Sequence, residues 1–317
     1  MKTFFMRFTV LFTMIALAFI CTFNGYDKAG SAYSAQDSDA VLMDAAVVAD
    51  LHTRSAINRD ENAVLTKLFS GISKSETKLN ALVFAGDITN NGTRDEYRCL
   101  AAILKRYNKA DHLIAATGNH DARGDMDEED YEENMECYYA FLSVMGVETD
   151  KPYWSQDVNG YRFIVLGSED EEKDRAYITD AQIEWLDAQL SAADESGKPA
   201  FIICHQTIDH TNNVDNYWYY DGSIGERSDD VLAVIRSHTD AGLPVVFISG
   251  HLHCGFTQYS FENPYPNLYC LNLPSGLYNE EFGQGVTLEA YADRVLIRTR
   301  NFITGEWMAD EYTVPLA

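Results

Sequence analysis

The sequence predicts an α/β fold whose central strands are buried on both faces of a sheet. The chain has 317 residues, of which 46% are hydrophobic, which is enough for a large core. Five short apolar runs each end at a polar cluster, and continuous runs of this length are typical of strands covered on both sides. Segments with helical spacing of apolar residues lie between them. The five runs are residues 47–49, 81–85, 113–116, 201–204 and 245–248.

Five helices are predicted along the chain. Thr179 with Gln182 forms a capping-box pattern at the start of one helix. Ser228 is expected to cap another helix, which ends near Gly242. The other three are predicted from apolar periodicity over residues 61–79, 94–107 and 131–145.

Further strands are predicted outside the five runs. The chain turns to β-structure from residue 267 onward, and Ala292-Asp293 is typical of a hairpin turn. No linker rich in proline, glycine or serine interrupts the core region, so we expect a single domain over residues 36–317. The additional strands are predicted over residues 161–167, 268–273, 286–291, 295–299 and 307–314.

The polar clusters after the five runs carry groups that bind divalent metal ions. Carboxylates, amide oxygens and imidazoles are ligands for hard or borderline ions. The carboxyl ends of central strands are where open α/β sheets bind ligands. Together the clusters offer enough ligands for two ions that share one carboxylate, the layout of a two-metal hydrolase. The clusters are D-x-H at 50–52, G-D at 86–87, G-N-H-D at 118–121, His205 and G-H-x-H at 250–253.

These five blocks, in this order, resemble the calcineurin-like metallophosphoesterase superfamily over about residues 42–300, with no ligand position substituted. One block alone would be a weak signal, whereas all five in order are specific. The resemblance implies a four-layer αββα sandwich with a dinuclear site, and the mixed N/O ligation admits Mn, Fe, Zn or Co without choosing among them. The ligands it implies are Asp50, His52 and His253 for the first ion, Asn119, His205 and His251 for the second, and Asp87 between both.

The chemistry of such a site needs these residue types. Two divalent ions roughly 3.5–4 Å apart can hold a bridging water and lower its pKa toward neutrality, which makes it the nucleophile. The resemblance implies that His120 is not a ligand but contacts the substrate phosphate, with Asn119, and protonates the leaving group. Asp121 follows in sequence and is a candidate to orient that imidazole.

The predicted function is metal-dependent hydrolysis of a small phosphorylated substrate, with phosphodiesters favoured over phosphomonoesters. Purple acid phosphatases carry a tyrosine ligand where this chain has Asn90, and they lack the histidine present here as His52. The pattern is more similar to bacterial phosphodiesterases of the cyclic-nucleotide and glycerophosphodiester type. Two alternatives stay open: a secreted, metal-stabilised binding protein without turnover, and a protein phosphatase.

Substrate selection is expected in the loop after His205. This loop contains His210 and Trp218, which we predict to bind substrate, and three tyrosines within 217–220. A lid whose rings stack on an organic leaving group and a loop that packs its rings on the scaffold agree equally with this composition.

The N-terminus has the pattern of a secretory signal. Lys2 and Arg7 precede the apolar stretch 8–20, and small residues follow. We therefore expect residues 1–35 to be a signal peptide with a short disordered segment. The mature protein would be extracytoplasmic, without stable membrane insertion. An uncleaved N-terminal anchor is the alternative.

The chain is strongly acidic, with a formal net charge of −25. Such a surface repels nucleic acid, so no nucleic-acid partner is expected. The acidic runs 125–133 and 169–174 are predicted to be solubilising surface, and the first lacks a calcium-loop signature. Of the six cysteines, five remain if the signal is cut, and an odd number with wide spacing does not make a disulfide framework. We expect Cys204 and Cys254, which flank two predicted ligands, to fill the core.

Overall fold

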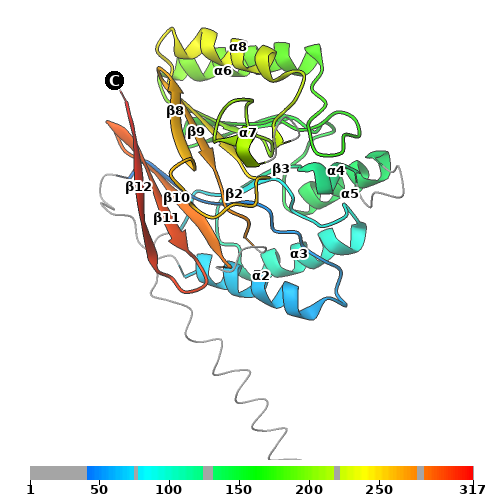
Figure 1. Cartoon of the computed structure of the whole chain (residues 1–317). Helices are drawn as coiled ribbons and strands as arrows, with labels where there is room; N and C mark the ends of the chain where they lie inside the picture. The colour runs from blue at the N-terminus through cyan, green and yellow to red at the C-terminus, as the bar shows by residue number, and fades with distance from the viewer. Residues whose placement is uncertain (1–40, 75–77, 124–130, 218–221, 277–281, 317) are drawn as a thin grey trace, which may run out of the picture.

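The chain folds into four layers, with two six-stranded sheets between outer helices (Figure 1). The computed structural model describes residues 41–316 apart from 75–77, 124–130, 218–221 and 277–281. The first sheet has the order β12 (Trp307–Pro315), β11 (Arg294–Asn301), β10 (Gln284–Ala290), β1 (Met43–Val48), β2 (Ala81–Ala85) and β3 (His112–Ala116). The second has the order β4 (Trp154–Val158), β5 (Tyr161–Val165), β6 (Ala200–Ile203), β7 (Val245–Ser249), β9 (Leu268–Asn272) and β8 (Phe261–Tyr265).

Helices cover the outer face of each sheet, so the predicted αββα sandwich is confirmed. Figure 1 shows α2 (Arg59–Ile72) and α3 (Arg94–Tyr107) under the first sheet. It shows α6 (Asp180–Ser196) and α8 (Ser228–Thr239) over the second. The other helices of the described residues are α4 (Asn119–Arg123), α5 (Tyr131–Val144) and α7 (Val214–Tyr217).

Alternating side chains of β6 pack into two separate hydrophobic cores. Phe201 and Ile203 are buried in the cluster that joins the two sheets. Ile202 is buried in the separate cluster beneath α6 and α8. Successive side chains of a strand point to opposite faces, so a continuous apolar run fits a strand that is covered on both sides.

The five apolar runs are strands, as predicted, and each polar cluster follows its strand directly. The strands β1, β2 and β3 are parallel neighbours, and so are β5, β6, β7 and β9. Parallel strands end at the same edge of a sheet. The metal-binding motifs therefore gather from two sheets at one edge of the sandwich.

Two helix predictions need correction. The helix predicted over 61–79 is α2, which ends at Ile72 with Ser73 as its C-cap. Leu79 is buried in the core just before β2, so it packs as part of the connection rather than on the helix. Ser228 is not the cap of α8 but its first residue, after Arg227. Its hydroxyl accepts a hydrogen bond from the backbone N–H of Asp209 instead.

The other helices agree more closely with the sequence. Helix α3 has the predicted bounds. At the start of α6 the Thr179 side chain accepts from the backbone N–H of Gln182, as a cap should. The predicted turn at Ala292-Asp293 connects β10 to β11, which pair antiparallel. The strands β4 and β8 were not predicted from periodicity, because both are short and partly exposed.

The predicted leader, residues 1–35, lies outside the described residues. Within the part of the chain that the structure describes, we find no helix with both the length and the apolar character needed to cross a bilayer.

Candidate metal centre

Left-handed backbone conformations turn five of the predicted ligands toward a common point. Asp50, His52, Asp87, His251 and His253 all have positive φ angles, between 40° and 71°. Such angles are uncommon for residues other than glycine and cost on the order of 1 kcal/mol each. Non-glycine residues in this region cluster at functional sites, where surrounding structure enforces them.

Hydrogen bonds fix these turns to one another. The backbone N–H of Asp50 donates to the carbonyl of Gly86, and that of His52 donates to the carbonyl of Asp87. Glycines allow the close approach: a Cβ added at Gly118 would overlap the carboxylate of Asp87. The turns after β1, β2 and β3 therefore form one interlocked unit.

The first group of possible ligands joins D-x-H to G-H-x-H. One ligand atom from each of Asp50, His52, Asp87 and His253 lies within 4.8 Å of the others. Nε2 of His253 is 2.9 Å from Oδ1 of Asp50. Nε2 of His52 is 3.1 Å from Nε2 of His253 and 3.5 Å from Oδ2 of Asp87. These atoms could hold a single metal ion.

The second group consists of Asp87, His205 and His251. Nε2 of His205 is 3.2 Å from Oδ2 of Asp87. Its Nδ1 lies 2.8 Å from the carbonyl oxygen of Ala85, which accepts a hydrogen bond from this ring. The bond directs Nε2 into the cluster. Asp87 belongs to both groups, so its carboxylate is placed to lie between two ions.

Asn119 lies beside this cluster at the start of α4. Its Nδ2 donates to the carbonyl of Lys173 at 3.3 Å, which leaves Oδ1 as the free end of the amide. The following backbone N–H, that of His120, donates to Oδ1 of Asp87 at 2.9 Å. The G-N-H-D block therefore contacts the shared carboxylate directly.

Buried ligand atoms without hydrogen bonds test whether these residues fit a metal. Within the described part of the chain, Oδ1 of Asn119 is buried and has no hydrogen-bond partner, while Oδ2 of Asp87 and Nε2 of His205 are buried facing each other at 3.2 Å. Leaving such groups unpaired is costly, so most buried polar atoms have partners. A carboxylate, an amide oxygen and an imidazole nitrogen left in this way suit a divalent ion of mixed N/O preference.

The charges of the cluster are strongly coupled. Burial raises the pKa of Asp87, but His205 and His52 hold it well below its ordinary value. Burial lowers the pKa of His205, but Asp87 and Asp50 raise it to about 9. Burial, with the charge of His205, lowers the pKa of His251 to about 4. The metal-free site thus retains a proton on His205 while His251 stays neutral.

His120 lies above the cluster with both ring nitrogens engaged. Its Nδ1 is 2.8 Å from the carbonyl oxygen of Asn90, so this nitrogen carries a proton. Its Nε2 is 3.3 Å from Nη2 of Arg123. The ring meets that of His52 edge-on at 4.7 Å between centroids. The backbone carbonyl of Asn90 therefore orients the ring of His120.

The expectation that Asp121 orients His120 is wrong in this structure. Oδ2 of Asp121 accepts from the backbone N–H groups of Ile88 and Gly118. Oδ1 accepts from the N–H and hydroxyl of Thr89 and from the hydroxyl of Tyr97. Neighbouring residues of a helix point in different directions, so Asp121 is turned away from the ring beside it. It clamps the G-D turn to the G-N-H-D turn.

A loop missed by sequence reasoning forms one wall of the centre. We call residues 168–178 the strap. It is closed on itself by a backbone hydrogen bond from Glu169 to Tyr177. The carbonyl of Lys173 accepts from both Asn119 and Arg123. Part of this loop was predicted to be solubilising surface. The acidic side chains of this run predicted exposure to solvent, whereas its main chain faces the site.

The loop after His205 gives a mixed result. His210 is largely exposed, and its ring interacts with the carboxylates of Asp209 and Asp215. These three form a separate group at the surface, so His210 is not brought to the cluster. Trp218 and the tyrosines at 219–220 lie outside the described residues. Their role as a lid stays a prediction.

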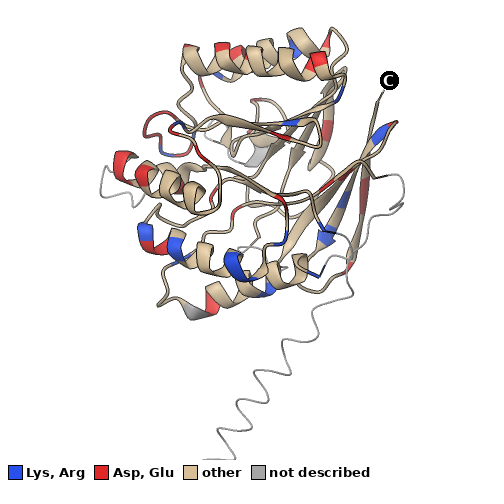
Figure 2. Cartoon of the chain, turned by 180° about the vertical axis from the view of Figure 1, so that it is seen from behind, with Lys and Arg blue, Asp and Glu red and all other residues tan. Residues whose placement is uncertain are grey.

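Neither flanking cysteine is in a disulfide. Cys204 is buried in the core beneath α6 and α8, as expected. Cys254 is only half-buried, and its thiol lies 3.7 Å from Oδ1 of Asn272. Burial raises the pKa of both thiols, to about 12 for Cys204 and about 11 for Cys254. The acidic run at 125–133 lies largely outside the described residues, while charged residues are spread over the outer helices (Figure 2).

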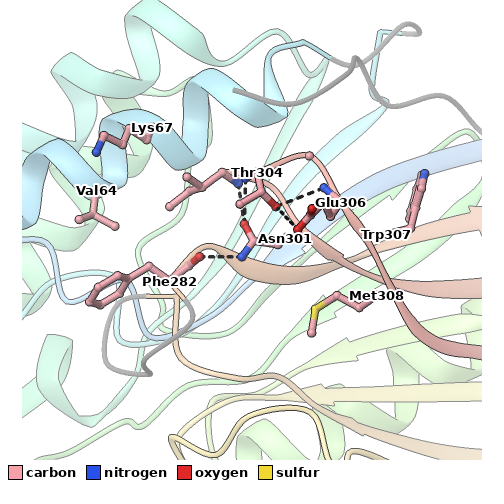
Figure 3. Close-up of a pocket in the computed structure, with 10 residues that line it drawn as sticks. Val64, Lys67, Phe282, Asn301, Thr304, Glu306, Trp307 and Met308 are labelled. Carbon is pink, nitrogen blue, oxygen red and sulfur yellow. Dashed lines mark hydrogen bonds between the residues drawn. The ribbon is translucent and has the colours of Figure 1, made fainter. Parts of the chain in front are cut away.

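A large hollow of about 900 Å³ lies away from this centre, between α2 and the β11–β12 hairpin. Figure 3 shows Lys67, Phe282, Glu306 and Trp307 among its lining side chains, with Glu306 next to Trp307. Glu306 interacts with Thr304 of the same turn. No group of possible metal ligands lies there among the residues that the structure describes.

Comparison with known proteins agrees with the geometry. A family model described as calcineurin-like phosphoesterase matches residues 43–255, about two thirds of the chain, with all five motifs. A probable cyclic nucleotide phosphodiesterase from Rhodococcus erythropolis is 30% identical over 161 residues. The match covers 49% of this chain and 48% of that protein, so the chain matches about half of that relative's length.

Two further proteins are similar over a larger share of the chain. A 3',5'-cyclic-nucleotide phosphodiesterase from Nostoc is 25% identical over 264 residues, covering 78% of this chain and 88% of that protein. The crystal structure of a dimetal phosphatase from Danio rerio has a TM-score of 0.58 and 16% identity. It covers 87% of this chain and 100% of its own. At that identity the similarity shows the fold alone.

Proposed function

Because the chain belongs to the family of calcineurin-like phosphoesterases, we propose that it is a metal-dependent hydrolase of phosphate esters, with phosphodiesters as favoured substrates. The observation that carries this proposal is that two groups of mostly buried side chains, each able to hold a metal ion, share Asp87. The phosphodiesterases from Rhodococcus and Nostoc support the preference for diesters.

The two groups define which residues would hold the ions. Asp87 would lie between both ions, and Asn119 would add its free amide oxygen to the second. When bound, two divalent ions supply a water of lowered pKa and neutralise charge on phosphoryl oxygens. The full set that we propose is Asp50, His52 and His253 for one ion, Asn119, His205 and His251 for the other, and Asp87 for both.

The side chains around the ions would position the substrate and supply the proton. Asn90 fixes the His120 ring through Nδ1, so Nε2 is the atom that can face a leaving oxygen. A histidine in this place can act as general acid near neutral pH, which is worth roughly 10²- to 10⁴-fold in rate. His120 is therefore the proposed proton donor.

Hydrolysis of two chromogenic esters tests this proposal. The protein is stripped of metal, reloaded with manganese or zinc, and assayed with bis(4-nitrophenyl) phosphate and 4-nitrophenyl phosphate. Metal-dependent turnover with a higher kcat/KM for the diester is expected. Cyclic nucleotides are the natural diesters to assay next, given the two relatives.

The control separates an enzyme from a metal-stabilised binding protein. Replacement of His120 by Gln should abolish most of the turnover while leaving the metal content unchanged. Two bound ions per chain without turnover of any ester would contradict the proposed activity and favour the binding protein.

A further inference from the structure

Arg123 is a buried cation beside the proposed general acid. It is the last residue of α4, its side chain is 10% exposed, and its Nη2 lies 3.3 Å from Nε2 of His120. Residues three apart in a helix share a face, so α4 directs both side chains to the same side. Sequence reasoning left Arg123 without a role.

The contacts of the guanidinium are divided between its two ends. Nη1 donates to the carbonyl of Lys173 at 2.7 Å and to Oδ1 of Asp174 at 3.3 Å. Nε is buried and has no hydrogen-bond partner among the described residues. Arginine has five N–H groups in a planar fork. One end of this fork is tied to the strap, while the Nη2 end faces His120.

The facing atoms of His120 and Arg123 form an incomplete pair. Nδ1 of His120 donates to Asn90, so the neutral ring presents only a lone pair at Nε2. Asp174 pairs with the Nη1 end of the guanidinium, whereas the Nη2 end of this buried cation meets an imidazole, which is not a counter-ion. Arginine forks match the oxygens of phosphate groups well.

We propose that Arg123 binds a phosphoryl oxygen of the substrate, beside His120. This inference rests on the proposed function, because that function brings the anion to this place. The guanidinium then contributes to substrate affinity as a fixed positive charge from the chain itself, in addition to the ions. Arg123 thus joins His120 in recognising the phosphoryl group.

A purely structural role for Arg123 would be to hold the strap. The strap has other attachments that do not involve this residue. Asn119 donates to the carbonyl of Lys173, and Nε2 of Gln206 donates to the carbonyls of Asp174 and Arg175. The strap should therefore keep its place when the guanidinium is removed.

Binding of inorganic phosphate to the metal-loaded protein, measured by calorimetry, tests the proposal without turnover. Arg123→Met removes the charge, and Arg123→Lys keeps it without the fork. Asp174→Asn weakens the tether to the strap but leaves the guanidinium. Arg162→Met is the matched control, because Arg162 forms an ion pair with Asp157 on the paired strands β4 and β5. Metal content and the thermal midpoint are recorded for each variant.

Arg123→Met should weaken phosphate binding roughly 10- to 100-fold, as expected for loss of a hydrogen bond to a charged group. It should raise KM for both nitrophenyl esters and keep two ions per chain. Arg123→Lys should recover part of the affinity, and Arg162→Met should match the wild type. Asp174→Asn should change phosphate affinity less than threefold.

Three results would overturn the proposal. Phosphate affinity within twofold of wild type in Arg123→Met would show that Arg123 does not bind the phosphoryl group. Equal losses in Arg123→Met and Asp174→Asn would show a tether only. In both cases turnover by the wild type would leave the proposed function intact. A wild type that neither binds phosphate nor turns over either ester would refute both proposals together.

Discussion

Replacement of Asp121 by Asn should destabilise the fold at the metal centre. Oδ2 of this carboxylate accepts from the N–H groups of Ile88 and Gly118, and Oδ1 accepts from Thr89 and Tyr97. Asparagine keeps one of the two carboxylate oxygens and has an NH₂ group in place of the other. This NH₂ must face either the N–H groups of Ile88 and Gly118 or the groups of Thr89 and Tyr97. Hydroxyls can rotate and accept, so the lower-cost arrangement turns the NH₂ toward Thr89 and Tyr97 and leaves one backbone donor, the N–H of Thr89, poorly paired.

The magnitude follows from the number of donors affected. Each buried donor that loses its acceptor costs about 1–3 kcal/mol, and one backbone donor, the N–H of Thr89, is affected in this arrangement. The substitution also removes the buried carboxylate of Asp121, whose pKa is raised by burial and by the repulsion of Asp87. That relief offsets part of the cost. We expect a net loss of about 1–2 kcal/mol in the free energy of unfolding.

Urea denaturation of the metal-free protein measures this loss, and a competition assay with a chelator measures zinc affinity. Asp121→Asn should lower both, because Asp121 ties the turn bearing Asp87 to the turn bearing Asn119. Asp95→Asn, at an exposed position on α3, is the control for loss of a carboxylate. Unchanged unfolding and zinc affinity with a reduced kcat alone would refute the reasoning, since it would mean that Asp121 acts on catalysis rather than on the turns.

Other predictions concern the ions and the thiols. Asp87→Asn should lose both ions, whereas His253→Ala should lose one and keep the other, as atomic emission analysis would show; equal losses would contradict the two-group geometry. The pKa of His205 is raised from 6.5 to about 9 in the folded metal-free protein, so this ring is protonated there at pH values between the two. Metal binding requires the neutral ring. Zinc binding should therefore release a proton in that pH window and strengthen as pH rises toward about 9, which calorimetry in buffers of different ionisation enthalpy can measure; pH-independent affinity would contradict this. The raised pKa of Cys254, about 11, predicts slow reaction with a thiol reagent at pH 8, and labelling at the rate of free cysteine would contradict it.

The strand ends could be predicted from sequence because their signal is local. Each buried strand is a continuous apolar run, and the proposed metal ligands follow it within a few residues. Parallel pairing then brings those residues to the same edge of their sheet, whatever the conformation of the loops. The position of Asp50 beside His253, two hundred residues later, also depends on how the two sheets pack, because β1 and β7 belong to different sheets.

The hydrogen-bonded surroundings of the centre could not be predicted in the same way. Asp121 was assigned to its neighbour in sequence, yet its partners come from residues 88–97 and from Gly118. The strap was hidden because its acidic side chains indicate solvent, while a single carbonyl, that of Lys173, makes its contacts to the site. Main-chain contacts of this kind do not depend on the residue type, so they leave no pattern in the sequence.

The left-handed conformations of the ligand residues also constrain how this protein could be engineered. Asp50, His52, Asp87, His251 and His253 occupy backbone angles that glycine adopts at lower cost. Screening for thermostability alone, without metal or activity, would therefore favour glycine or asparagine at these positions. Variants from such a screen would gain heat resistance while losing the centre, and a chelator-sensitive assay during selection would prevent that loss.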